Sequence, residues 1–382
     1  MWRSIASNVI TFLVVAVFLL GGVILWGQRQ YYQAGPLEAA VCLKVERGSN
    51  MTEVSRDLEG SGAITSGSIF RIGSKYTEKD EQLKAGSFLI EPESSMSEII
   101  SVITEGGPST CGTEVVYRVG VNRIETQVRE LDPETGRFVE RMSFDPTEEV
   151  PEAYASVHDQ AGTRYRIAFA EGVTSWQVVQ GLAQVDVLKG EIESIPAEGA
   201  LAPDSYEVRV GDSREVVIER MAEAQTEILN RAWESRADDL PLKTPQEALI
   251  LASIIEKETA VAAERGVVAS VFINRLDKGI RLQTDPSVIY GITKGQGVLG
   301  RGLRQSELKR KTDWNTYVIA GLPKTPIANP GRASIEAALN PEDTKFLYFV
   351  ADGSGGHAFA STLDEHNRNV AKWRAIEAER SN

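Results

Sequence analysis

The sequence predicts an α+β protein that begins with one membrane-spanning helix. Three observations support this prediction: an apolar run near the N-terminus, a strand–turn–helix pattern that recurs along the first half, and a helix from Pro245 that is apolar on nearly every face. A chain of 382 residues is long enough for two or three domains. Its content of 42% hydrophobic and 25% charged residues is typical of a globular protein with an ample core.

The apolar run from Val9 to Trp26 has 18 residues and only Thr11 as a polar side chain. As a helix it is about 27 Å long, which is enough to cross the hydrocarbon core of a bilayer. A cleaved signal peptide is the alternative, but the following GQRQYYQAG has no small-x-small cleavage site. We therefore interpret residues 1–27 as a short cytoplasmic stub and a retained anchor, with the membrane contacted through residues 9–26.

A strand–turn–helix unit recurs at residues 45–58, 90–103 and 169–182. Each copy has a polar residue at the helix N-cap and Glu or Gln three residues later, which is the pattern of a capping box. The pairs are Asn50 with Glu53, Ser95 with Glu98, and Thr174 with Gln177. Residues 209–221 are a fourth copy with a weaker cap. Independent helix starts would show the same boxes, so the pattern alone does not establish a binding module.

An inserted segment at 109–165 separates the second copy from the third. It is predicted to be rich in β-structure, with a hairpin whose tight turn is DPETG at 132–136. The acidic stretch 146–153 is predicted to be a loop, and no catalytic motif is visible in the insertion.

The helix that begins at Pro245 is predicted to be buried. Thr244 and Glu247 form a capping box, and Pro245 occupies the first helical position. From Ala248 to Ile255 the residues are apolar almost all the way round. We expect the helix to end near 259–261, and a second helix to end at Lys278-Gly279.

Glu256 and Glu258 lie in the last turn of this helix, about 200° apart around its axis. The stripe beneath Glu258 is Leu251, Ile254 and Ile255, and that beneath Glu256 is Leu249, Ala252 and Ser253. Burial and the negative end of the helix dipole both raise the pKa of a carboxyl group, which suits a proton donor. The more apolar stripe favours Glu258 for this role. A structural ion pair with Lys257, Arg265 or Arg281 is the alternative for either glutamate.

Several other function classes lack their sequence signals. The net charge of −13, without a Lys/Arg cluster interleaved with aromatic residues, argues against a nucleic-acid partner. There is no GxSxG, no P-loop, and no cysteine with an obvious histidine partner. The three histidines do not form HExxH, so we expect no metal site and no cofactor.

Five motifs in the C-terminal half together carry a family resemblance. They are EKETAVAAERGVVASVFINRL, GIRLQTDPSVIYGI, NTYVIAGLPKTPIANPG, FLYFVADGSGGHAF and EHN. From about residue 201 to 372 the chain resembles the YceG-like family of membrane-anchored endolytic murein transglycosylases. The resemblance implies a LysM-like small α/β subdomain at 40–108 and a catalytic α+β domain at 166–378, whereas 109–165 does not match the family pattern.

The resemblance also implies an activity: cleavage of MurNAc–GlcNAc β-1,4 bonds in nascent peptidoglycan glycan strands, which leaves 1,6-anhydroMurNAc ends and terminates elongation. The family's catalytic glutamate corresponds to Glu258 at the helix C-terminus, with Glu256 and Arg281 in supporting roles. The substrate-binding candidates are Gln283, Asp285, Tyr290, Asn315, Tyr317, Asn329 and His357. A muramidase-type hydrolase and a non-enzymatic cell-wall-binding scaffold are the alternatives.

The implied location is the inner membrane, with one span and a periplasmic catalytic part, and peptidoglycan synthases are possible partners. In the oxidising periplasm the only two cysteines, Cys42 and Cys111, are able to pair. They flank the first two copies of the repeated unit, so a disulfide between them would close that subdomain.

Overall fold

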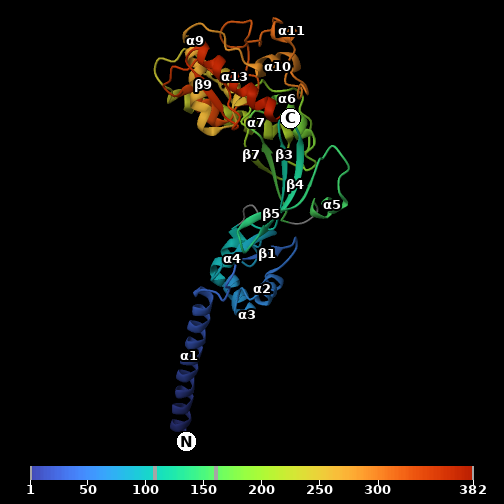
Figure 1. Ribbon diagram of the computed structural model, residues 1–382. Helices are drawn as coiled ribbons and strands as arrows, with labels where there is room; N and C mark the ends of the chain where they lie inside the picture. Colours follow the sequence, from blue (N-terminus) through green and yellow to red (C-terminus); the bar gives the residue numbers. More distant parts are fainter. Residues whose placement is uncertain (1, 106–109, 159–161, 381–382) are drawn as a thin grey trace. The chain divides into compact units, whose positions relative to one another are not determined.

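The computed structural model describes residues 2–105, 110–158 and 162–380 (Figure 1). The chain divides into two compact units, each made of three segments that alternate along the sequence. Unit 1 comprises residues 1–116, 127–144 and 150–165, and unit 2 comprises 117–126, 145–149 and 166–382. Helices and strands occur in both units, so the α+β prediction is confirmed. The insertion at 109–165 is shared between the two units.

Helix α1 (Trp2–Tyr32) contains the predicted anchor. Its segment Ile10–Tyr32 is long and apolar enough to cross a membrane. The large apolar side chains of this segment are mostly exposed as far as Trp26. An exposed apolar surface of this length fits a helix that is solvated by lipid rather than by water.

The remainder of unit 1 begins with a small βααβ arrangement followed by a helix. Its elements are β1 (Val41–Val45), α2 (Met51–Gly60), α3 (Gly67–Tyr76), β2 (Gly86–Ile90) and α4 (Met96–Glu105). Strands β1 and β2 are antiparallel, with Val41 opposite Ile90. The reciprocal capping hydrogen bonds predicted for Asn50 and Ser95 both form.

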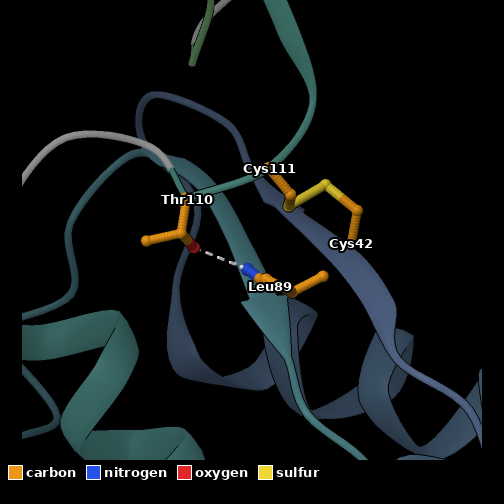
Figure 2. Close-up of a disulfide and its surroundings, with 4 residues drawn as sticks. All are labelled: Cys42, Leu89, Thr110 and Cys111. Carbon is orange, nitrogen blue, oxygen red and sulfur yellow. Dashed lines mark hydrogen bonds between the residues drawn. A yellow bond between two sulfur atoms is a disulfide. The ribbon is translucent and has the colours of Figure 1, made fainter. Parts of the chain in front are cut away.

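A disulfide joins Cys42 in β1 to Cys111, 69 residues later (Figure 2). Beside it, the amide of Leu89 donates to Oγ1 of Thr110 at 2.7 Å. These two links hold the segment that follows α4 against the β1–β2 pair.

Five strands form a second sheet in the order β5-β4-β3-β6-β7. They are β3 (Thr113–Val119), β4 (Ile124–Asp132), β5 (Arg137–Phe144), β6 (Arg164–Phe169) and β7 (Ser205–Val208). The turn between β4 and β5 is the predicted DPETG, in which Asp132 accepts from the amide of Glu134 at 3.0 Å. The predicted loop 146–153 gives way at Glu152 to a short helix, α5 (Glu152–His158).

Unit 2 is mainly helical. Its elements outside the sheet are α6 (Ser175–Ala183), α7 (Arg214–Glu234), α8 (Pro245–Glu258), η1 (Ala262–Glu264), α9 (Arg265–Asp277), α10 (Asp285–Thr293), α11 (Gln305–Leu308), α12 (Arg332–Leu339), β8 (Tyr348–Ala351), β9 (His357–Ala360) and α13 (Leu363–Arg380). Helix α8 lies at the centre, in contact with α7, α9, α10 and α12. All eight residues from Ala248 to Ile255 are buried, as predicted from their composition.

The two ends of α8 differ in detail from the prediction. At its start, Thr244 accepts from the amide of Glu247 at 3.2 Å. The Glu247 carboxylate, however, accepts from the amide of Lys243 rather than from that of Thr244, so only half of the capping box forms. The helix ends at Glu258 because Thr259 is extended, with φ −140° and ψ 131°. Glu258 is therefore the last helical residue.

Candidate active site

The two glutamates at the end of α8 have different surroundings. Oε2 of Glu256 accepts from the backbone amide of Gly331 at 2.9 Å. Gly331 is the N-cap residue of α12 and has no side chain with which to cap that helix. Because the first amides of a helix lack intrahelical partners, the Glu256 carboxylate supplies an acceptor to the start of α12. These contacts give Glu256 a structural role.

Glu258 is partly exposed, and its carboxyl group is poorly solvated. Burial is the main cause that raises its pKa to about 7, and the negative charge of Asp285 adds to the rise. The hydroxyl group of Thr284 and the positive charge of Arg275 act in the opposite direction. A carboxyl group with this pKa is protonated in a large fraction of molecules near neutral pH and is able to donate a proton.

The turn before α10 brings Thr284 and Asp285 to Glu258. Gln283 adopts a left-handed conformation, with φ 54°, and its side chain is exposed. A positive φ is uncommon for a residue other than glycine, and strained positions of this kind cluster at functional sites. The amide of Thr284 donates to Oγ1 of Thr316 at 2.9 Å. The side chain of Thr284 is 3% exposed, and its hydroxyl has no hydrogen-bond partner of ordinary geometry in the described part of the chain.

Tyr317 borders the same carboxyl group. Its hydroxyl donates to Oδ1 of Asp285 at 2.7 Å, and the guanidinium of Arg281 donates to the Tyr317 carbonyl at 3.1 Å. Burial, Asp285 and Glu258 all raise the pKa of Tyr317, so its hydroxyl stays protonated. Asp285 and Tyr317 are thus the predicted substrate-binding residues whose charges or hydroxyl lie close to Glu258.

Arg275 on α9 belongs to the site and was missed from the sequence. Its Nε donates to the Leu347 carbonyl at 2.6 Å, and Nη1 donates to the Leu282 carbonyl at 2.7 Å. These bonds hold a buried cation whose charge lowers the pKa of Glu258. The available signal was an arginine inside the largely apolar run VVASVFINRL.

Asn315 and Asn329 are buried and engaged within the protein. Nδ2 of Asn315 donates to the carbonyls of Glu307, Leu308 and Arg310. Its Oδ1 accepts from the amide of Tyr317 at 3.0 Å. Asn329 accepts from the amide of Leu201 and donates to the Val173 carbonyl. A hydrogen bond from either amide group to a sugar would compete with these loop-holding bonds.

Tyr290 and His357 each contact the carboxylate of a residue other than Glu258. The Tyr290 hydroxyl donates to Oε2 of Glu198 at 3.1 Å. Nδ1 of His357, at the start of β9, lies 2.7 Å from Oε2 of Glu264. Both residues therefore have structural partners, and neither interacts directly with Glu258 in the described contacts.

Two adjoining pockets are lined by residues of α6, α10 and the last turn of α8. The first has a volume of about 340 Å³ and is lined by Lys257 and Pro286, the sequence neighbours of Glu258 and Asp285. The second has about 360 Å³ and shares Gln177 and Val298 with the first, among other residues. Amide and aromatic side chains line the second pocket, namely Asn122, Trp176, Gln177, Gln180 and Gln184. Together they form one extended groove, which we call the α6 groove.

Within residues 2–105, 110–158 and 162–380, no group of three or more His, Cys, Asp or Glu side chains is arranged to hold a metal ion.

Comparison with known proteins gives consistent matches over most of the chain. The model of the YceG-like family matches residues 43–136 and 141–372. The endolytic murein transglycosylase of Bacillus subtilis (strain 168) is 28% identical over 361 residues, which cover 93% of this chain and 91% of the relative. The endolytic murein transglycosylase of Streptococcus pneumoniae serotype 2 is 27% identical over 395 residues, which cover 96% of this chain and 65% of the relative. A solved structure of a YceG-like protein from Listeria monocytogenes is 25% identical, covers 87% of this chain and 99% of its own, and has a TM-score of 0.44.

Proposed function

This chain belongs to the YceG-like family, and from that membership we propose that it is a membrane-anchored lytic transglycosylase that cleaves peptidoglycan glycan strands. The bond is the MurNAc–GlcNAc β-1,4 linkage, and the products end in 1,6-anhydroMurNAc. Two relatives named endolytic murein transglycosylase support the activity, since they match more than nine-tenths of this chain.

The observation that carries the proposal is the environment of Glu258. Its pKa is raised to about 7 by burial and by Asp285, and it is the last residue of a buried helix. A neutral carboxylic acid at a partly exposed position is able to give its proton to the oxygen of a leaving sugar.

The proposed reaction needs one acid–base residue and no water. Glu258 donates its proton to the glycosidic oxygen as the C1–O4 bond breaks. The C6 hydroxyl oxygen of the same muramic acid then bonds to C1, and its proton returns to the Glu258 carboxylate. Intramolecular attack benefits from proximity, which contributes about 7–11 kcal/mol in well-oriented cases.

A muramidase-type hydrolase is the second candidate, because a second carboxylate is present. Most glycosidases use two carboxyl groups, one as acid and one to attack or to activate water. Asp285 is close enough to Glu258 for its charge to raise the pKa of that residue, although it also accepts the hydrogen bond of Tyr317. The two activities give different product ends: a hydrolase leaves a reducing end, and a transglycosylase leaves an anhydro end.

The α6 groove offers a path for more than one sugar of an uncleaved strand. Its lining includes Lys257 and Pro286, the chain neighbours of Glu258 and Asp285, together with amide and aromatic side chains, which are suited to hydroxyl-rich ligands. An open path of this kind supports cleavage within a strand rather than only at its end. Release of nascent strands from peptidoglycan synthases, as a terminator of elongation, is the biological role that we propose.

The test is digestion of purified, uncrosslinked glycan strands by the full chain in detergent, followed by mass spectrometry of the products. We expect internal cuts with 1,6-anhydroMurNAc ends, their loss in Glu258→Gln, and their retention in Glu256→Gln. Reducing ends would indicate the hydrolase. Unchanged cleavage by a folded Glu258→Gln variant would refute the assignment of Glu258.

The proposed location is the inner membrane, with the catalytic part in the periplasm. If α1 is retained as an anchor, the protein remains with membranes through carbonate and high-salt washes, and its mature chain starts at or near Met1. A mature N-terminus near residue 30 would show instead that the apolar helix is removed as a signal.

A further inference from the structure

Helix α3 is packed tightly against the C-terminal end of α1, and both belong to unit 1 (Figure 1). Tyr31 of α1 is only 6% exposed and is part of the core of that unit. A Cβ atom on Gly73 of α3 would lie 2.1 Å from the Tyr31 ring, so only glycine permits this close approach. The hydroxyl of Thr65 also donates to Oε1 of Gln30 at 3.2 Å. The end of α1 is therefore built into the core, and packing sets the direction of α3.

A largely apolar groove of about 440 Å³ lies between these two helices. Val23, Ile24 and Trp26 of α1 line one side of it. Ile72 and Tyr76, on successive turns of α3, line the other side and are 70% and 81% exposed. Large apolar side chains gathered on one face of a surface helix indicate an interaction site.

We propose that lipid fills this groove and that α3 lies at the outer boundary of the bilayer, with Ile72 and Tyr76 in contact with acyl chains. The groove is continuous with the candidate membrane span, because Val23 and Ile24 belong to the segment Ile10–Tyr32. When α1 crosses the bilayer, the medium around these two residues is lipid. The same medium reaches the α3 side, since the groove is open.

The length of α1 places the groove near the headgroup region of the bilayer. The 23-residue segment Ile10–Tyr32 is about 35 Å long, and the hydrocarbon core is about 30 Å thick. The last turns of the segment therefore extend into the headgroup region. Trp26 and Tyr32 are exposed there, and Tyr76 joins them from α3. Aromatic rings of this kind are enriched at membrane–water interfaces, where Lys75, also exposed, is able to reach headgroup phosphates.

This contact goes beyond the proposed activity and depends only on α1 crossing the membrane. It holds the first βααβ module against the membrane surface, because α3 is a part of that module. The anchor α1 is then fixed at the membrane surface by its contact with α3 and does not act as a flexible tether.

The test uses the full chain reconstituted in phospholipid vesicles, with a nitroxide on one introduced cysteine at a time. Ile72→Cys reports on the groove, Leu13→Cys on the span, and Arg47→Cys on an exposed turn outside the groove. The natural cysteines are held in their disulfide and do not take the label. Relaxation by oxygen, which concentrates in lipid, is compared with relaxation by a water-soluble nickel complex.

We expect the oxygen-to-nickel accessibility ratio at position 72 to match that at position 13 and to exceed that at position 47 severalfold. A ratio at position 72 that equals the ratio at position 47, with position 13 in lipid, would overturn the proposal. Spin–spin broadening at position 72 in sparsely loaded vesicles would also overturn it, because a second copy would then occupy the groove. A water-like ratio at position 13 would show that α1 does not cross the bilayer. It would therefore overturn the proposal, whatever the cleavage activity of the protein. Unchanged melting curves confirm that the labelled variants are folded.

Discussion

The carboxylate of Glu256 accepts a hydrogen bond from the amide of Gly331, with 2.9 Å between oxygen and nitrogen. This contact attaches the last turn of α8 to the first turn of α12 and occupies one of the two neighbouring glutamates. Glu258, two residues on, is poorly solvated and lies near Asp285, and its pKa is raised to about 7. The fold thus engages the Glu256 carboxylate, and Glu258 is the residue that we propose as the proton donor.

Glu256→Ala is expected to lower the free energy of unfolding by about 0.5–2 kcal/mol, as loss of a helix N-cap does. Helix α12 packs on α8, so the effect should appear in the cooperative unfolding of unit 2. Denaturant unfolding measures it, and cleavage well below the melting temperature should persist. Glu336→Ala, at an exposed position on α12, is the matched control. An inactive but fully stable Glu256→Ala variant would contradict the structural role.

Cleavage is expected to decline as the pH rises through about 7, because the protonated form of Glu258 is the proton donor. The decline should follow a single ionisation, with about a tenfold loss for each pH unit well above the pKa. Initial rates of strand cleavage between pH 5 and 9 measure it. A rate that rises throughout this range would show that the essential form of the residue is the carboxylate.

Asp285→Asn is expected to shift the alkaline limb of the activity profile to lower pH, because the charge of Asp285 helps to raise the pKa of Glu258. Activity at pH 8 relative to pH 5.5 should fall about three- to tenfold, which corresponds to a shift of up to one unit. Asn retains an oxygen for the Tyr317 hydroxyl. Asp313→Asn, which removes an exposed carboxylate paired with Lys324, should leave the profile unchanged. Complete loss of activity at every pH would favour a two-carboxylate hydrolase.

Glu258→Gln is expected to stabilise the protein at pH 8 and to have little effect at pH 4. Between the ordinary pKa of a glutamate and about 7, the folded state keeps a proton that the unfolded state has released. The stability of the wild type therefore falls with rising pH in this window, and glutamine removes the penalty, which is at most about 3 kcal/mol. Urea unfolding of both proteins at the two pH values tests the sign. Equal stabilities at pH 8 would show that the carboxyl group ionises without cost.

Replacement of both Cys42 and Cys111 by alanine is expected to destabilise unit 1 by about 2–5 kcal/mol. The bridge closes a loop with a sequence separation of 69, and long loops lose the most entropy in the cross-linked unfolded chain. Chemical denaturation with and without a reductant measures the effect. The reductant should weaken the wild type and leave the double variant unchanged. A wild type that resists reductant, with no change in its unfolding curve, would contradict the prediction.

Local sequence signals were sufficient for a large part of the fold. The apolar run from Ala248 to Ile255 predicted a buried helix, and Asn50, Ser95 and Thr174 predicted helix starts that all form. The turn DPETG predicted a hairpin that is present. The half-formed box at Thr244 shows the limit of such signals, because Lys243 offers a competing amide to the Glu247 carboxylate.

The candidate site was less accessible from the sequence. The apolar stripe beneath it and the family resemblance point to Glu258, whereas neither points to Arg275 or Thr284. Their effect on Glu258 depends on α9 and the turn before α10 meeting the end of α8. Asn315 has an inviting side chain in a motif, yet three backbone carbonyls within the protein accept from its amide group.

The sequence by itself therefore determined the elements that depend on near neighbours: a helix long enough to cross a membrane, its capped successors, and a central helix with no polar face. Only the tertiary structure decided which polar groups form hydrogen bonds within the protein. Periodicity and capping are interactions over a few residues and can be read along the chain. The partner of a buried polar group is instead whichever donor or acceptor the fold brings to it, often from a distant segment. For Glu256 that partner is Gly331, 75 residues away, and no pattern near either residue announces it.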